Sequence, residues 1–213
     1  MLIVFDLDGT LLNTIEDLSA AANYALHTCG FPKRSVEQCR QFVGNGVSKL
    51  LERCLPSQAR TSANLAAMKR AFFAYYGKHL TAKTVPYPGI IALLIELQKR
   101  TIKLAVASNK YQQATEELIG HFFPQIAFSA VLGQRGNVPL KPNPQIVYEL
   151  LTLTGETVAN CLYVGDSAVD MQTAQNAGVR ACGVTWGFRP KEELAGCHPN
   201  WLIDSPLDLL HLL

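Results

Sequence analysis

The chain has 213 residues, of which 48% are hydrophobic and 17% are charged, and it carries a formal net charge of +2. This much apolar surface is enough to bury a core, which excludes an intrinsically disordered chain. Because the charge is small and no run of basic residues occurs, we expect no nucleic-acid partner.

The N-terminal sequence and the cysteines indicate a cytoplasmic protein. The apolar stretch at residues 1–5 is shorter than a signal peptide requires, and two acids follow it closely. No apolar run approaches the roughly 18 residues of a membrane span, so no membrane association is expected. The six cysteines include no Cys-x-x-Cys pair, and we expect reduced, mostly buried thiols rather than disulfides or a zinc site.

A helical segment is predicted between residues 14 and 86, directly after the first strand, because no convincing strand pattern occurs there. Thr14 and Ser35 are expected to cap its first two helices, Ser35 in a capping box with Gln38. The turn at residues 44–46 precedes a third helix, and a fourth follows. Basic residues outnumber acidic ones in this segment.

Strands and helices alternate in the rest of the chain, which predicts an α/β fold with a parallel sheet. The expected strands are residues 2–5, 104–107, 130–132, 162–164 and 181–184. The expected helices are residues 89–100, 112–123, 143–154 and 168–177. We therefore expect a core made of residues 1–13 and 87–213, with an all-helical domain inserted at residues 14–86.

Asp6 and Asp8 stand where the first strand ends, and a glycine follows them. In parallel α/β sheets, ligands bind beyond the carboxyl ends of the strands. Because side chains alternate along a strand, the two acids are expected on one face, where they repel each other unless a cation or a proton intervenes. The alternative is a solvated acidic turn.

A second pair of acids, Asp166 and Asp170, follows the strand at residues 162–164. In one interpretation, Asp166 only caps the helix that begins there. In the other, these acids join the first pair in holding Mg²⁺, which prefers oxygen ligands and needs only a few carboxylates.

Ser108 and Lys141 are candidates for contact with a phosphate group. Ser108 ends the strand at residues 104–107 and precedes Asn109, and a hydroxyl beside main-chain N–H groups at a helix start can hold a phosphate. The ammonium of Lys141 can reach a phosphate as a point charge, although a lysine in such a position, taken alone, is more often an exposed loop residue. Together with the acids, these groups meet the needs of phosphoryl transfer through an aspartyl phosphate.

Over its whole length the chain resembles the phosphatases of the haloacid dehalogenase superfamily. The four motifs of that superfamily are matched in order by residues 6–10, 108–110, 141–142 and 165–170. The resemblance implies a Rossmann-like core with a helical cap inserted after the first strand. Within the superfamily, the chain is similar to phosphoglycolate phosphatases at Gly44-Asn45-Gly46, Tyr87-Pro88-Gly89 and Thr185-Trp186-Gly187-Phe188.

The resemblance implies a Mg²⁺-dependent phosphatase that acts on a small phosphorylated metabolite, with phosphoglycolate as the first candidate. The implied catalytic residues are Asp6, Asp8 and Lys141. The implied phosphate-binding residues are Ser108, Asn109 and Lys141. The implied metal ligands are Asp6, Asp8 through its main-chain carbonyl, Asp166 and Asp170. In this scheme Asp6 is the nucleophile, Asp8 is the general acid and base, and Asp170 either binds the metal through water or orients Lys141.

The inserted segment is expected to contact the substrate. Asn45 and Gly46, in a tight turn, are the candidates, although the turn also needs glycine for its backbone alone. Lys49 and Arg189 are further, weaker candidates for a substrate carboxylate, and such residues are more often ordinary surface cations.

Other functions stay open at this point. The same chemistry serves phosphatases for pyrophosphate, sugar phosphates or nucleotides, and sugar phosphomutases keep both acids. A phospho-acceptor regulatory domain without turnover uses a similar cluster of acids, although the helical insertion argues against it. The presence of Asp8 argues against a dehalogenase, whose halide leaving group needs no proton. We expect a monomer or a homodimer.

Overall fold

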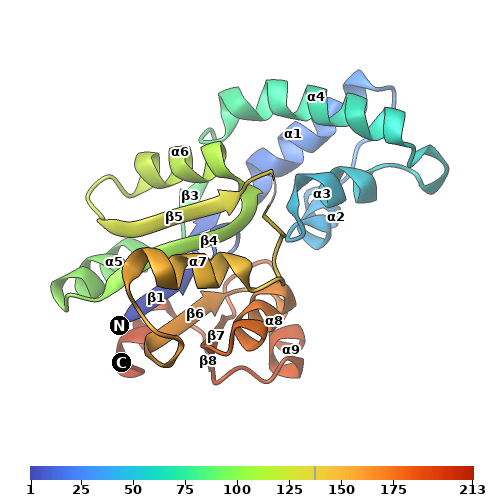
Figure 1. Ribbon diagram of the computed structural model, residues 1–213. Coiled ribbons are helices and arrows are strands. Elements are labelled where there is room, and N and C mark those ends of the chain that lie inside the picture. Colours follow the sequence, from blue (N-terminus) through green and yellow to red (C-terminus); the bar gives the residue numbers. More distant parts are fainter. Residues whose placement is uncertain (137) are drawn as a thin grey trace. The chain divides into compact units, whose positions relative to one another are not determined.

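The computed structural model describes residues 1–136 and 138–213 (Figure 1). The chain divides into two compact units. One unit, called the core here, comprises Met1–Asn13 and Pro86–Leu213, and the other, called the insertion, comprises Thr14–Val85. Two short strands, β2 (Leu12–Asn13) and β3 (Val85–Pro86), pair with each other where the chain passes between the units.

The core is built on a parallel sheet with the strand order β5-β4-β1-β6-β7-β8. Its strands are β1 (Leu2–Phe5), β4 (Lys103–Tyr111), β5 (Phe128–Gln134), β6 (Cys161–Gly165), β7 (Arg180–Val184) and β8 (Trp201–Ile203). The predicted α/β fold with a parallel sheet is therefore confirmed. The edge strand β8 was not predicted, because its three residues are too few to show a pattern.

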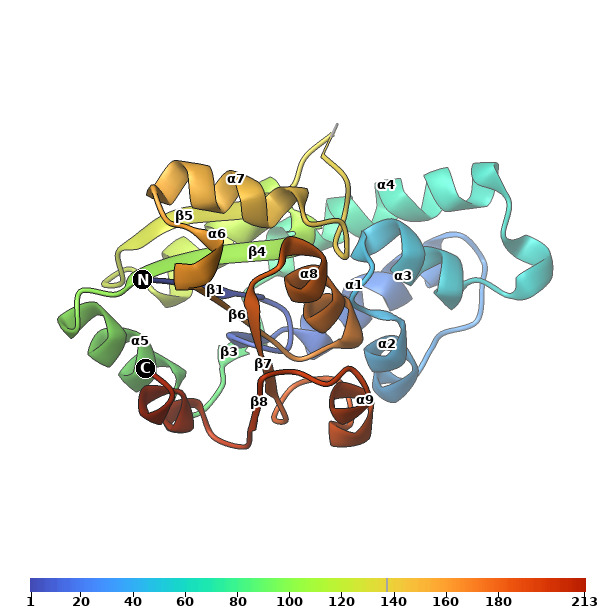
Figure 2. The ribbon, with the colours of Figure 1, turned by 60° about the horizontal axis from the view of Figure 1, so that its bottom comes forward.

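Helices cover both faces of this sheet (Figures 1 and 2). On one face, α7 (Gln145–Thr154) and α8 (Ala168–Ala177) share a buried cluster with Leu2 and Val4 of β1. On the other face lie α5 (Ile90–Lys99) and α6 (Gln112–Phe122). The remaining short helices of the core are η2 (Val158–Asn160), α9 (Lys191–Gly196) and η3 (Pro206–His211). Since both faces are covered, the central strand β1 is apolar and buried at every residue, as parallel strands usually are.

One strand is longer than the sequence indicated. Leu104–Ala107 was expected to end at Ser108, but β4 continues to Tyr111, with a register irregularity between Ala107 and Tyr111. The polar residues 108–110 are buried, and their side chains have hydrogen-bond partners, so they continue the strand instead of forming an exposed turn.

The insertion consists of helices. They are α1 (Ile15–Thr28), α2 (Val36–Phe42), α3 (Gly46–Cys54), η1 (Ser57–Ala59) and α4 (Ser62–His79). The capping box of Ser35 with Gln38 is confirmed. The prediction for Thr14 is wrong: it occupies the N-cap position of α1, but its backbone is not extended and its side chain makes no capping hydrogen bond.

A buried carboxylate ties the two ends of the insertion together. Asp17 in the first turn of α1 accepts hydrogen bonds from the main-chain N–H groups of Lys83 and Thr84 and from the Thr84 hydroxyl, at 2.8–3.1 Å. Asp17 is only 3% exposed. Three donors therefore compensate the charge that burial would otherwise penalise.

Among the described residues, no helix has both the length and the hydrophobicity that crossing a membrane would require. All six cysteines are free, and four of them are buried.

Candidate active site

The ends of three adjacent strands bring the predicted polar residues to one edge of the sheet. β1 lies between β4 and β6, so Asp6 after β1, Ser108 in β4 and Asp166 after β6 are neighbours in space although they are far apart in sequence. The main-chain N–H of Asp6 still donates to the carbonyl of Val164 at 2.9 Å, which fixes the end of β1 against β6.

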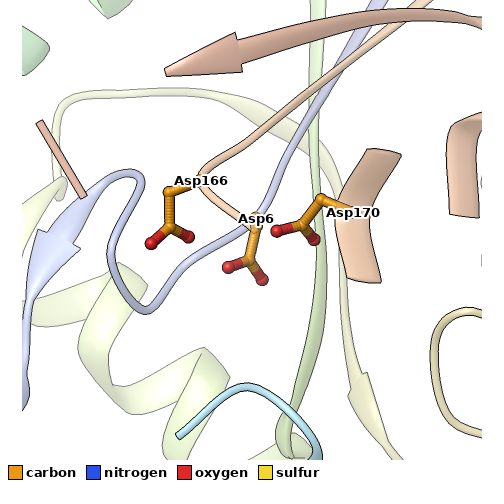
Figure 3. Close-up of side chains that lie close together, drawn as sticks. All are labelled: Asp6, Asp166 and Asp170. Atoms are coloured by element: carbon orange, nitrogen blue, oxygen red, sulfur yellow. The ribbon is translucent and has the colours of Figure 1, made fainter. Parts of the chain in front are cut away.

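Asp6, Asp166 and Asp170 form a buried cluster in which carboxylate oxygens of the three residues lie within 4.8 Å of one another. Figure 3 shows the three carboxylates side by side, with Asp6 in the middle. Burial raises the pKa of Asp6 to about 7, and the charge of Asp170 adds to this against the opposing effect of Lys141. Burial, together with the charges of Asp170 and Asp6, holds the pKa of Asp166 well above its usual range. A cluster of this kind favours a bound cation.

Lys141 is not an exposed loop residue. Its ammonium donates to Asp6 Oδ1 and Asp170 Oδ1, both at 2.7 Å, and also contacts the Ala107 carbonyl at 2.9 Å and the Tyr163 hydroxyl at 3.0 Å. Burial by itself would lower the pKa of Lys141, but the charges of Asp170 and Asp6 outweigh it and raise the pKa well above the ordinary value. The lysine therefore stays charged between the two acids.

Asn109 holds Lys141 in place. Its side-chain amide donates to the Lys141 carbonyl at 3.1 Å and accepts from the Lys141 main-chain N–H at 2.8 Å. The sequence suggested contact with phosphate for Asn109, but its side chain bonds both main-chain groups of the lysine.

Both carboxylate oxygens of Asp170 have partners. One oxygen accepts from Lys141, and the other accepts from the Ser167 hydroxyl at 2.6 Å and from the Ser167 main-chain N–H at 3.2 Å. Ser167 is the N-cap of α8 and forms a capping box with Asp170. The suggestion that Asp166 caps this helix is therefore wrong, because the neighbouring serine does so.

Asp166 is enclosed by Gly9 and Thr10 of the motif at residues 6–10 and by residues 186–188, whose contact with this acid was not predicted. The main-chain N–H of Phe188 donates to its Oδ2 at 2.7 Å, and the Thr10 hydroxyl donates to its Oδ1 at 3.3 Å. A Cβ atom at Gly187 or at Gly9 would overlap the Asp166 side chain. The Trp186 indole donates to the Thr10 carbonyl at 3.0 Å and so joins these two segments. Only the similarity of residues 185–188 to a known family hinted at this arrangement.

Asp8 lies apart from the acidic cluster and pairs with a second lysine. The ammonium of Lys110 is 3.0 Å from both Asp8 Oδ1 and Asp8 Oδ2. The Ser108 hydroxyl, which is buried, accepts from the main-chain N–H of Lys110 at 3.1 Å. The pairing of Asp8 with Lys110 was not predicted, because the two residues are 102 positions apart in sequence.

The substrate candidates of the insertion lie on one turn. Asn45 is the N-cap of α3, and Gly46 begins the helix with a φ of 79°, a backbone conformation that favours glycine. Both residues are partly buried. Lys49 is exposed and pairs with Glu52 at 2.7 Å, as a surface cation usually does. The other candidate, Arg189, belongs to the core and lies 3.7 Å from Glu193.

Comparison with known proteins identifies the family. Residues 3–184 match the family model of haloacid dehalogenase-like hydrolases. The phosphoglycolate phosphatase of Vibrio parahaemolyticus is 33% identical over 220 residues, covering 100% of this chain and 95% of that protein. The corresponding protein of Mannheimia succiniciproducens is 32% identical and is covered to 97%.

The fold comparison agrees with the sequence comparison. A crystal structure described as a predicted phosphoglycolate phosphatase from Haemophilus somnus superposes with a TM-score of 0.92 at 32% identity, covering 99% of this chain and 96% of that one. The match to the family model extends over most of the chain and includes each of the predicted motif segments. The chain therefore belongs to the haloacid dehalogenase-like hydrolase family.

Proposed function

We propose that this protein is a Mg²⁺-dependent phosphatase that hydrolyses a small phosphorylated metabolite through an aspartyl phosphate on Asp6. Phosphoglycolate is the first candidate substrate, because phosphoglycolate phosphatases match the chain over nearly its whole length. The observation that supports the activity best is the position of Asp6. Its carboxylate lies beside Asp166 and accepts from Lys141, while Asp8 follows two residues later on the same chain segment.

In the proposed reaction, ionised Asp6 attacks the phosphorus atom, and the bond from phosphorus to the substrate oxygen breaks. Asp8 gives its proton to the departing alcohol. Asp8 then takes a proton from a water molecule, which attacks the aspartyl phosphate and releases inorganic phosphate and the free Asp6 carboxylate. General acid–base help of this kind is worth about 10²–10⁴ in rate.

The other polar residues hold the phosphate. The Ser108 hydroxyl and the Lys141 ammonium would contact its oxygens and offset the negative charge that builds up during transfer. Asn109 supports this step indirectly, because its amide fixes the main chain of Lys141.

The donor atoms suit Mg²⁺, a hard cation that takes oxygen ligands. Asp6 and Asp166 are the proposed carboxylate ligands, joined by the main-chain carbonyl of Asp8. Asp170 is better suited to holding Lys141 and touching the ion through water, because both its oxygens already accept hydrogen bonds. The ion would supply the positive charge that allows one anion to attack another.

The insertion is proposed to act as a cap that selects the substrate. Asn45 and Gly46 would contact the part of the substrate that is not phosphate, and the cap would open to release the product. A panel of phosphoglycolate, pyrophosphate, sugar phosphates and nucleotides, compared by kcat/KM, identifies the preferred substrate. Isomerisation of a sugar phosphate without net release of phosphate would identify a mutase instead.

The activity is tested by phosphate release from these esters with Mg²⁺ and with EDTA. Asp6→Asn should abolish turnover while leaving the fold intact, as measured by circular dichroism. The matched control is Asp204→Asn, an exposed acid in the core that pairs with Lys191. Turnover that survives Asp6→Asn, or that is absent from the wild type with every ester, would refute the proposal. The second outcome would favour a regulatory domain without turnover.

A further inference from the structure

Lys110 is a buried cation that the proposed reaction does not use. Its side chain is 3% exposed, and its ammonium lies 3.0 Å from each carboxylate oxygen of Asp8, which is itself 14% exposed. Ion pairs on the protein surface usually contribute little. This pair is shielded from solvent, and it engages both oxygens of the acid that the proposed reaction needs.

The main chain of Lys110 is fixed from three sides. Its N–H donates to the Ser108 hydroxyl at 3.1 Å, and its carbonyl accepts from the Thr115 hydroxyl of α6 at 3.3 Å. On the third side lies Gly133 of β5, where a Cβ atom would come within 2.6 Å of the Lys110 carbonyl oxygen. The ammonium therefore projects from a rigid base, and it can fix the position of another side chain.

Asp8 is held by a different lysine from the other acids of the site. Asp6 and Asp170 are held by Lys141, and Asp166 is held by Phe188 and Thr10, but Asp8 lies outside that cluster. A carboxylate oxygen has two lone-pair sites, so each Asp8 oxygen can accept from Lys110 and still exchange a proton. Proton transfer needs a separation of about 2.6–3.2 Å, and a misplacement of about 1 Å can lower the rate 10²-fold.

We propose that Lys110 is a positioning residue that holds the Asp8 carboxylate in the orientation required for proton transfer to the leaving alcohol. The proposal rests on the proposed phosphatase activity. It gives the segment Ser108–Lys110 three separate tasks: Ser108 would contact the phosphate, Asn109 secures Lys141, and Lys110 secures Asp8.

The test compares two esters that differ in their need for a proton. An alkyl phosphate such as phosphoglycolate releases an alkoxide unless Asp8 protonates it, whereas p-nitrophenyl phosphate releases a stable phenolate. The comparison uses kcat/KM, because this quantity depends on the rates of the steps up to departure of the leaving group. It does not depend on the later hydrolysis of the aspartyl phosphate. Lys110→Met should lower kcat/KM about 10–100-fold for the alkyl ester and less than about 5-fold for the aryl ester.

Three comparisons make the test specific. Lys110→Arg, which keeps the charge, should recover part of the loss with the alkyl ester. Asp8→Asn should show the same selectivity between the esters, and the double variant Lys110→Met with Asp8→Asn should be no slower than Asp8→Asn alone, because both changes act on one step. Lys191→Met, which removes an exposed lysine of the core, should leave both esters unaffected.

Other outcomes overturn the proposal. An equal fall for both esters would mean that Lys110 only supports the fold, and an equal rise in KM for both would mean that it binds the phosphate. If Lys110→Met does not fold, Lys110→Arg is used instead. Its ratio of kcat/KM for the alkyl ester to kcat/KM for the aryl ester is compared with that of the wild type. A ratio equal to that of the wild type, at reduced activity, counts against the proposal. A wild type inactive on every ester would instead refute the proposed function.

Discussion

Replacing Lys141 by methionine should destabilise the protein strongly at pH 8. At 2.7 Å, and with an effective dielectric constant of about 20, each of the pairs Lys141–Asp6 and Lys141–Asp170 represents about 6 kcal/mol of attraction. Much of this is offset by the desolvation of the charges, and losing one partner of a buried pair costs about 3–5 kcal/mol. For a chain of this size, that loss lowers Tm by about 6–20 °C.

Thermal unfolding followed by circular dichroism, without added metal, measures this loss. The control is Lys191→Met, because Lys191 and Asp204 form a similar pair at 3.0 Å in which both side chains are more than half exposed, and it should change Tm by no more than 1–3 °C. The deficit of Lys141→Met should shrink at pH 5, since Asp6 can then take up a proton. An effect no larger than that of the control, or one that does not depend on pH, would refute the reasoning.

Three further predictions concern the metal site, its acids and the insertion. Gly187→Ala displaces Asp166 and should weaken Mg²⁺ binding at least about tenfold by calorimetry, whereas Gly120→Ala, where the added methyl group meets nothing within 4 Å, should not. Because the folded pKa of Asp6 is raised from 3.8 to about 7, the folded protein keeps a proton that the unfolded chain has lost. The metal-free protein should therefore lose up to about 4 kcal/mol of stability through Asp6 as pH rises from 4 to 7, and a stability that rises across this window would contradict the assignment. Asp17→Ala leaves buried main-chain donors unsatisfied and should destabilise the insertion by about 1–3 kcal/mol in denaturant unfolding, whereas Glu16→Ala, beside it but exposed, should change stability by less than about 0.5 kcal/mol.

The buried acids of the site are subject to two opposing demands: burial favours their neutral form, and the proposed reaction requires Asp6 to be ionised. In the proposed reaction Asp6 has to be ionised to attack phosphorus, yet burial raises its pKa. Lys141 already opposes this increase, and a bound cation would oppose it further. If the cluster holds the proposed cation, stability and metal binding should be coupled, because the cation would favour the ionised carboxylates that burial disfavours.

The sequence by itself determined the class of fold and which acids lie at the ends of the strands. A parallel sheet was predicted because its strands are buried on both faces and hence apolar without interruption, and Leu2–Phe5 shows this pattern clearly. The position of Asp6 and Asp166 at strand ends followed from the same pattern, since parallel strands end at one edge of a sheet. The capping box of Ser35 was also predictable, because it depends on residues three positions apart.

Only the tertiary structure decided which group each side chain touches. Lys110 and Asp8 are 102 positions apart, Phe188 and Asp166 are 22 apart, and Asn109 and Lys141 are 32 apart, so no local pattern connects them. The burial of Lys141 was not predictable either, because the sequence around this lysine also fits an exposed loop. Local sequence determines which residues reach the edge of the sheet, because hydrophobic periodicity and capping act over a few residues. Charge pairing and pKa depend on distances that are set only when β1, β4 and β6 come together.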